Sequence, residues 1–161
     1  MQHEMSRRDM IRASAALVGG VCGCRMAGEP TASQSTCCGT PDLEPESVTF
    51  EPGGLTIDLS KAPSLRNVGS AAYIVNQDKS LQIIVVRADK KRYRALSRLC
   101  THGGQVISYN RTRGMLQCNN FNHSIFDLDG NVWKGPAKQP LKSYPVILVE
   151  DTLAIAVEVQ A

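Results

Sequence analysis

The sequence has little of what would indicate a nucleic-acid partner, a membrane span or a nucleotide cofactor. Its net charge is only +3 over 161 residues, which is too mild to suggest binding to nucleic acid. No apolar run reaches the roughly 20 residues that are needed to cross a bilayer. A Walker loop and a dinucleotide-binding glycine pattern are also missing, so nucleotide cofactors have no support.

Histidine is scarce as well, and the positions of the three histidines are informative. His3 lies in a segment that we expect to be removed or membrane-bound, which leaves His102 and His123 for the folded part. Each of these two is close to a cysteine, Cys100 or Cys118, whereas the other four cysteines crowd the N-terminal quarter. A disulfide scaffold would distribute pairs through the folded region, so we do not predict one.

Residues 1–24 have the layout of a bacterial export signal. A polar stretch containing Arg7 and Arg8 precedes a short run of small and apolar residues, 13–21. The arginine pair resembles the twin-arginine signal, a route that passes folded, metal-loaded proteins. An ordinary amphipathic N-terminal helix is the alternative. We predict an exported protein, located in the periplasm or at the outer face of the cytoplasmic membrane.

The end of this signal offers a candidate lipid attachment site. Residues 21–24 resemble a bacterial lipobox that ends in Cys24, and ordinary cleavage near Ala27 is the alternative. Residues 25–47 follow, rich in Pro, Ser, Thr, Gly and Glu and without hydrophobic periodicity, which predicts a flexible linker. Cys37 and Cys38 lie inside this linker, and we assign them no function.

From residue 48 to residue 161 the pattern is typical of an all-β domain. Short alternating or β-branched runs recur between turn signals at roughly 8–12-residue spacing, and no segment shows a long 3.6-residue apolar repeat. This predicts an antiparallel β-sandwich or small barrel with a single core. The predicted strands are 56–59, 72–75, 81–86, 93–99, 115–118, 146–149 and 153–159.

Two short segments each offer one thiolate and one imidazole: Cys100 to His102, and Cys118 to His123. A lone zinc ion takes two Cys and two His in many proteins, but paired zinc ligands are usually two to four residues apart. Cys100 and His102 have one residue between them, so in an extended segment they point the same way with Cα atoms about 6.6 Å apart. This spacing suits two ligands that reach different irons of one cluster, as in a Rieske centre.

In their order along the chain, these segments resemble the Rieske [2Fe–2S] family over residues 55–160. Residues 100–104 are similar to its first cluster-binding loop, 124–130 to the end of its second, and 135–137 to its proline loop. The resemblance implies an all-β Rieske fold with a cluster-binding loop subdomain. It also implies one [2Fe–2S] cluster, with two Cys on one iron and two His on the other. The implied ligands are Cys100, His102, Cys118 and His123.

The second loop departs from the family pattern. In the family, the ligand His follows the Cys of this loop after two intervening residues. Here Phe121 stands at that position, and His123 comes two residues later. Either the loop is reshaped and His123 still binds iron, which we favour, or the domain has kept its fold without a cluster. The cysteines that join the two loops in respiratory members are also replaced, by Gln105 and Asn120. We therefore expect the loops to be held by the cluster and by hydrogen bonds.

Two further residues are expected to tune the cluster. Ser124 is similar to the family serine whose hydroxyl donates to a bridging sulfide. Phe126 takes the place of a tyrosine that donates to a Cys sulfur in high-potential members, and core filling is its alternative role. Without that donor, we predict a reduction potential below the top of the range of roughly −150 to +300 mV. Leu141 and Pro136 are expected in an apolar rim for a redox partner.

The resemblance implies an electron-transfer component that is not a catalyst by itself. The resemblance suits a stand-alone carrier, a part of a quinol-oxidising complex, or a small oxidoreductase subunit similar to the small subunit of arsenite oxidase. The implied partner is a larger oxidoreductase subunit or a cytochrome.

Other functions have less support in the sequence. An oxygenase is disfavoured, because its mononuclear iron needs two more histidines and a carboxylate, and no histidines remain. Cys–His nucleophilic catalysis lacks an orienting third group. A Rieske-shaped binding module without a cluster, or with zinc, is the remaining alternative.

Overall fold

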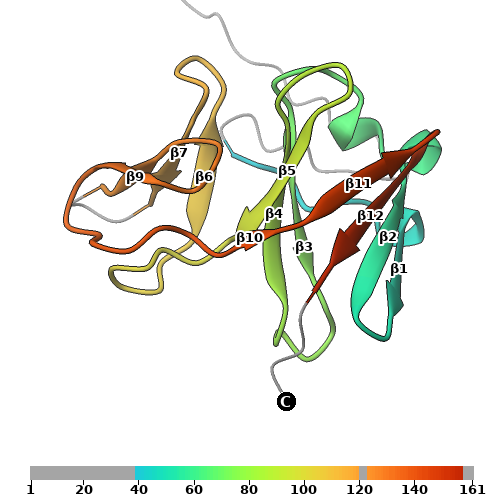
Figure 1. Ribbon diagram of the computed structural model, residues 1–161, viewed down its shortest axis with the longest axis horizontal. Coiled ribbons are helices and arrows are strands. Elements are labelled where there is room, and N and C mark those ends of the chain that lie inside the picture. Colours follow the sequence, from blue (N-terminus) through green and yellow to red (C-terminus); the bar gives the residue numbers. More distant parts are fainter. Residues whose placement is uncertain (1–38, 120–122, 158–161) are drawn as a thin grey trace, which may run out of the picture. The chain divides into compact units, whose positions relative to one another are not determined.

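The computed structural model describes residues 39–119 and 123–157. The predicted signal, 1–24, and most of the predicted linker, 25–47, lie outside these residues. The described residues contain twelve strands, three short 3-10 helices and no α-helix (Figure 1), which confirms the all-β prediction. In this part of the chain, no helix has the length and apolar character needed to cross a membrane.

Three antiparallel sheets of four strands each make up the fold. The first has the order β1 (Val48–Glu51), β2 (Gly54–Asp58), β12 (Thr152–Ala156), β11 (Val146–Val149). The second has the order β10 (Ser143–Tyr144), β5 (Tyr93–Ser97), β4 (Gln82–Arg87), β3 (Ala71–Val75). The third has the order β6 (Ile107–Asn110), β7 (Met115–Cys118), β8 (Ile125–Phe126), β9 (Val132–Lys134). The 3-10 helices are η2 (Pro45–Ser47), η3 (Leu59–Lys61) and η4 (Pro63–Leu65).

The second sheet is apolar on both faces. Four consecutive residues of β4, 83–86, are buried, and successive side chains of a strand point to opposite faces. Ile83 and Val85 join one apolar cluster with the inward residues of β2 and β12. Ile84 and Val86 join another with inward residues of β6, β7 and β8. The second sheet therefore lies between the other two and supports the third sheet from behind.

Most predicted strands occur close to their expected ranges. The predictions 115–118 and 146–149 match β7 and β11 without a shift, and the prediction 153–159 corresponds to β12, which ends at Ala156. Strands β1, β6, β8, β9 and β10 are not predicted from the sequence. Three of them, β8, β9 and β10, have only two or three residues, which is too short for a clear alternation of apolar and polar residues.

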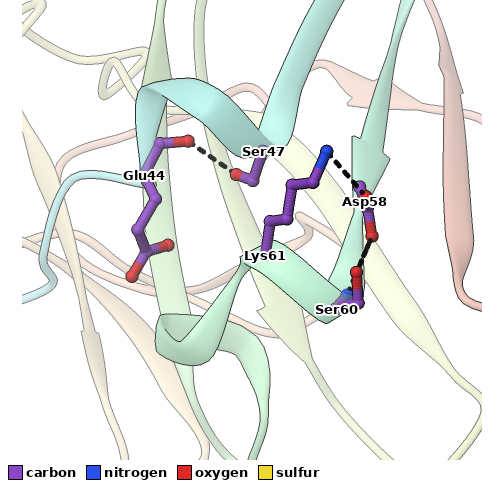
Figure 2. A network of polar contacts seen from close by, with 5 residues as sticks. All are labelled: Glu44, Ser47, Asp58, Ser60 and Lys61. Carbon is purple, nitrogen blue, oxygen red and sulfur yellow. Dashed lines mark hydrogen bonds and ion pairs between the residues drawn. The ribbon is translucent and has the colours of Figure 1, made fainter.

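The last residues of the predicted linker pack against the β-domain. Leu43 is 6% exposed and belongs to the first apolar cluster. The Ser47 hydroxyl donates to the Glu44 carbonyl at 2.6 Å. Figure 2 shows this bond beside the neighbouring contacts of Asp58 with Ser60 and Lys61 in η3. Packing against the domain therefore begins ahead of residue 48, the predicted start of the domain.

Tyr73 joins the second sheet to the third through a buried hydrogen bond. Its hydroxyl donates to the backbone carbonyl of Ile107, the first residue of β6, at 2.7 Å. Burial raises the pKa of the Tyr73 phenol, so the group stays protonated and remains a donor. The guanidinium of Arg98 lies 4.2 Å from the centre of the ring. The bond fixes the strand that leads away from the first candidate ligand loop.

We expect Tyr73→Phe to lower the free energy of unfolding by about 1–2 kcal/mol, because the buried Ile107 carbonyl loses this donor. Tyr93→Phe is the matched control. Tyr93 is 4% exposed, and its hydroxyl has no hydrogen-bond partner among the described residues. Its removal should leave the stability unchanged or slightly raised. Urea unfolding of both variants measures the difference, and equal losses would contradict this account.

Candidate metal centre

Cys100 and Cys118 lie on neighbouring segments at one end of the third sheet. Cys118 is the last residue of β7, and the N–H of the next residue, Asn119, donates to the carbonyl of Val106 at 3.0 Å. Val106 in turn forms an antiparallel bridge with Leu99, the residue before Cys100. Both cysteine-bearing segments are therefore hydrogen-bonded to the same short piece of chain, from opposite sides.

The first loop, 100–105, is closed by its own backbone. The Cys100 N–H donates to the Gln105 carbonyl and the Gly104 N–H donates to the Cys100 carbonyl, both at 2.8 Å. Gly104 has a φ of +66°, a left-handed conformation that glycine adopts at little cost. The turn exposes His102 while Cys100 stays 3% exposed. Gln105 thus holds the loop through its backbone carbonyl.

The second loop leaves the sheet at Cys118 and returns at His123. Residues 120–122, which include Phe121 and Asn120, lie outside the described residues. The Cys118 side chain is 3% exposed, and its backbone N–H donates to the Ser124 carbonyl at 2.9 Å. Nδ1 of the exposed His123 lies 3.0 Å from the Cys118 carbonyl oxygen. The histidine is therefore turned back toward the cysteine of its own loop.

The segment 135–141, which begins with the predicted proline loop at 135–137, connects the two ligand loops. The Thr101 hydroxyl donates to the Gln139 carbonyl at 2.7 Å, and the Ala137 N–H donates to the Ser124 hydroxyl at 3.1 Å. Ser124 is 1% exposed. Because its oxygen accepts the bond from Ala137, its own hydrogen can be donated elsewhere. Hydrogen bonds to one shared segment thus join the loops where respiratory members would use a disulfide.

The donor groups fit a Rieske centre in their chemistry and in their burial. Cys100 and Cys118 share one apolar cluster, whereas His102 and His123 are exposed. This arrangement would give an inner iron two thiolates and an outer iron two imidazoles. Within residues 39–119 and 123–157, no three His, Cys, Asp or Glu side chains gather around one point as a single ion would require. A Rieske centre needs two such donors for each iron.

The apolar surroundings differ in part from the prediction. Leu141 was expected in an exposed rim, but it is 3% exposed and belongs to the same cluster as the cysteines. Its N–H donates to the Gly130 carbonyl at 2.8 Å. Pro136 is half-buried. Phe126 is fully buried, so it fills the core behind the cysteines.

Three residues near the loops were not singled out from the sequence. Thr101 and Gly135 act through contacts with distant segments, which a local pattern does not reveal. Trp133, the one tryptophan of the chain, is 62% exposed on β9. A lone large aromatic in a short polar strand is a signal that could have identified it, because such residues often contact partner proteins.

Comparisons with known proteins bear on the family and the fold. The family model of the Rieske [2Fe-2S] domain matches residues 61–145. A plasma membrane Rieske protein from the cyanobacterium Synechocystis PCC 6803 is 20% identical, with 54% of this chain and 86% of that chain covered and a TM-score of 0.48. The ferredoxin of carbazole 1,9a-dioxygenase from Nocardioides aromaticivorans IC177 is 19% identical, with 63% and 93% covered and a TM-score of 0.50. No curated protein matches the chain.

Gly135 allows the proline loop to approach the second ligand loop closely. A Cβ atom at this position would lie 2.6 Å from the Ser124 Cα and 2.7 Å from the His123 carbonyl oxygen. The φ of Gly135 is +112°, which residues with a side chain rarely adopt.

We therefore expect Gly135→Ala to lower the free energy of unfolding by about 2 kcal/mol or more, because the backbone of one loop must move. Gly103→Ala is the matched control, since a Cβ atom there meets nothing within 4 Å and should change stability by less than about 0.5 kcal/mol. Thermal unfolding of the two variants measures the contrast. If Gly135→Ala were as stable as Gly103→Ala, the close approach would be refuted.

Proposed function

This chain belongs to the Rieske [2Fe–2S] domain family, and we propose that it transfers electrons through one [2Fe–2S] cluster held by Cys100, His102, Cys118 and His123. One observation carries the proposal: two buried thiols on neighbouring segments are each followed by an exposed imidazole in the adjoining loop. The family resemblance alone would not place His123, because its spacing differs from the usual pattern. Its contact with the Cys118 carbonyl supports a reshaped loop that still presents it.

The chain's own residues would orient the cluster and control the access of water. The apolar cluster around Cys100 and Cys118 keeps solvent away from the sulfur side. His102 and His123 lie on the solvent side, where they would provide the path for an electron to a docked partner. The cluster itself supplies the one-electron redox chemistry. We do not assign a catalytic step to the chain alone.

The proposed location rests on the N-terminal pattern, and the proposed partner rests on the family resemblance. Arg7, Arg8 and the short apolar run after them support export of the folded protein, and Cys24 is the candidate lipid attachment site. The carrier would then work at the periplasmic side, as a small oxidoreductase subunit or a mobile carrier. A larger oxidoreductase subunit or a cytochrome would be its redox partner.

The cluster assignment is tested by metal content and by electron paramagnetic resonance after reduction with dithionite. We expect about two irons and no zinc per chain, with the signal of a His-ligated cluster. His102→Ala and His123→Ala should each lose that signal, because one iron then has a single protein ligand. His3→Ala is the control and should keep it, since His3 precedes the domain.

Two other results would contradict the assignment. Protein that stays iron-free after cluster reconstitution would indicate a binding module that has the Rieske fold but no cluster. Stoichiometric zinc in place of iron would indicate a structural metal site.

Ser124→Ala tests the tuning of the cluster. A hydrogen bond from its hydroxyl to a sulfide would stabilise the more negative, reduced state. If that bond is worth about 1 kcal/mol, its loss lowers the potential of a one-electron couple by roughly 40 mV. Ser47→Ala is the control, because Ser47 is also buried but donates to the carbonyl of Glu44, the residue before η2. Redox titration measures both potentials, and an unchanged potential in Ser124→Ala would refute the tuning role.

A further inference from the structure

Three connected segments gather seven cationic side chains. These segments are residues 66–70 after η4, the end of β4 with the turn to β5 (87–92), and the turn between β6 and β7 (111–114). Figure 1 shows the two turns near the top of the view. We call this surface the basic patch, and its cations are Arg66, Arg87, Lys90, Lys91, Arg92, Arg111 and Arg113.

Arg87 and Arg111 connect the segments to each other. The Arg87 guanidinium donates to the Arg66 carbonyl at 2.5 Å and to the Lys90 carbonyl at 3.0 Å. The Arg111 guanidinium donates to the Val68 carbonyl at 3.4 Å. The segments therefore form one continuous surface instead of three separate charged turns.

The positive charge of the basic patch is not compensated within the described residues. Asp89 is the one carboxylate in the three segments, and it accepts a hydrogen bond from the Lys90 backbone N–H at 2.6 Å. The two ion pairs of the described residues, Lys61–Asp58 and Arg94–Asp129, involve none of the seven cations. The patch carries more positive charge than the whole chain, whose net charge is +3. The field of such a surface favours an extended anionic partner.

The basic patch also combines charge with an exposed apolar residue. Six of the seven cations are exposed, all except Arg87. Val68 lies among them with 45% of its surface exposed. Cations around a shallow apolar contact suit the boundary between lipid headgroups and acyl chains.

The patch is separated from the candidate metal centre by the length of the strands. β6 runs from Ile107, beside the Cys118 segment, to Asn110, next to Arg111. β5 runs from Tyr93, next to Arg92, toward the first ligand loop. Strands of this length span about 13–17 Å at ~3.3 Å per residue. A surface that covers the patch therefore leaves both histidines uncovered.

The chain enters the described domain beside the same surface. The Thr40 hydroxyl accepts a hydrogen bond from the Tyr109 backbone N–H at 3.0 Å, and Tyr109 is two residues before Arg111. The 38 residues that precede the described part contain the predicted export signal and Cys24.

We propose that the basic patch docks on an anionic lipid surface, with the ligand loops directed away from it. The membrane is the one at which the predicted export signal would hold the chain. Electrostatic attraction to anionic headgroups adds up over the cations and weakens as salt screens it. The docking does not require the cluster, so it is separate from the proposed redox role.

Vesicle co-sedimentation of the full-length protein tests the docking. The vesicles contain phosphatidylcholine alone or a mixture with anionic phosphatidylglycerol. We expect binding to the anionic vesicles, release at high salt, and at least about tenfold weaker binding by Lys90→Glu/Lys91→Glu. Lys79→Glu/Lys142→Glu is the matched control: it makes the same change in net charge at exposed lysines outside the patch. It should stay within about twofold of the unmodified protein.

Three outcomes would overturn the proposal. Equal losses in the two double variants would mean that only net charge matters. Equal binding by all three proteins would assign the affinity to the N-terminal segment. Binding to polyglutamate but not to anionic vesicles would point to an acidic protein in place of lipid. None of these readings depends on iron content, so they do not bear on the redox function.

Discussion

The pairing of β6 with β7 is the interaction on which the candidate centre depends. It sets Cys118 opposite Ile107. Val106, the residue before Ile107, is then hydrogen-bonded to Asn119 and bridged to Leu99. A slip of one residue would turn Cys118 to the other face of the sheet and break this relation. The register is held by apolar contacts of Ile107 and Leu116, both fully buried. The two thiols are therefore positioned by packing, before any metal is considered.

The second sheet makes this register possible because it is apolar on both faces. Its far face packs on the first sheet, and its near face supports Leu116, Phe126 and the two cysteines. The Tyr73 hydroxyl adds a directional bond to the start of β6. Hydrogen bonds from Thr101 and to Ser124 then attach both loops to the segment 135–141. The second sheet and the segment 135–141 thus hold the ligand loops in place, while the imidazoles of His102 and His123 remain exposed to solvent.

The fold class, the family and the longer strands were predictable from the sequence, because alternation and the two ligand segments are local patterns. The inward position of Leu141 was not, since it depends on packing with residues distant in the sequence, such as Cys100 and Leu116. The contact of Thr101 with Gln139 joins residues 38 positions apart, and the close approach at Gly135 involves backbone atoms of His123 and Ser124. The basic patch was also missed, because its three segments are separate in the sequence and the net charge is small.

The central claim is that both His102 and His123 ligate one cluster despite the altered spacing of the second loop. Pulsed electron paramagnetic resonance of reduced protein with ¹⁵N-labelled histidine tests it most directly, because coupling to the electron spin is confined to nitrogens bound to iron or adjacent to it. The account predicts two strongly coupled histidine nitrogens in the unmodified protein, whereas each single histidine variant should lose the cluster signal. A cluster with one coupled histidine nitrogen, unchanged in His123→Ala, would contradict the account.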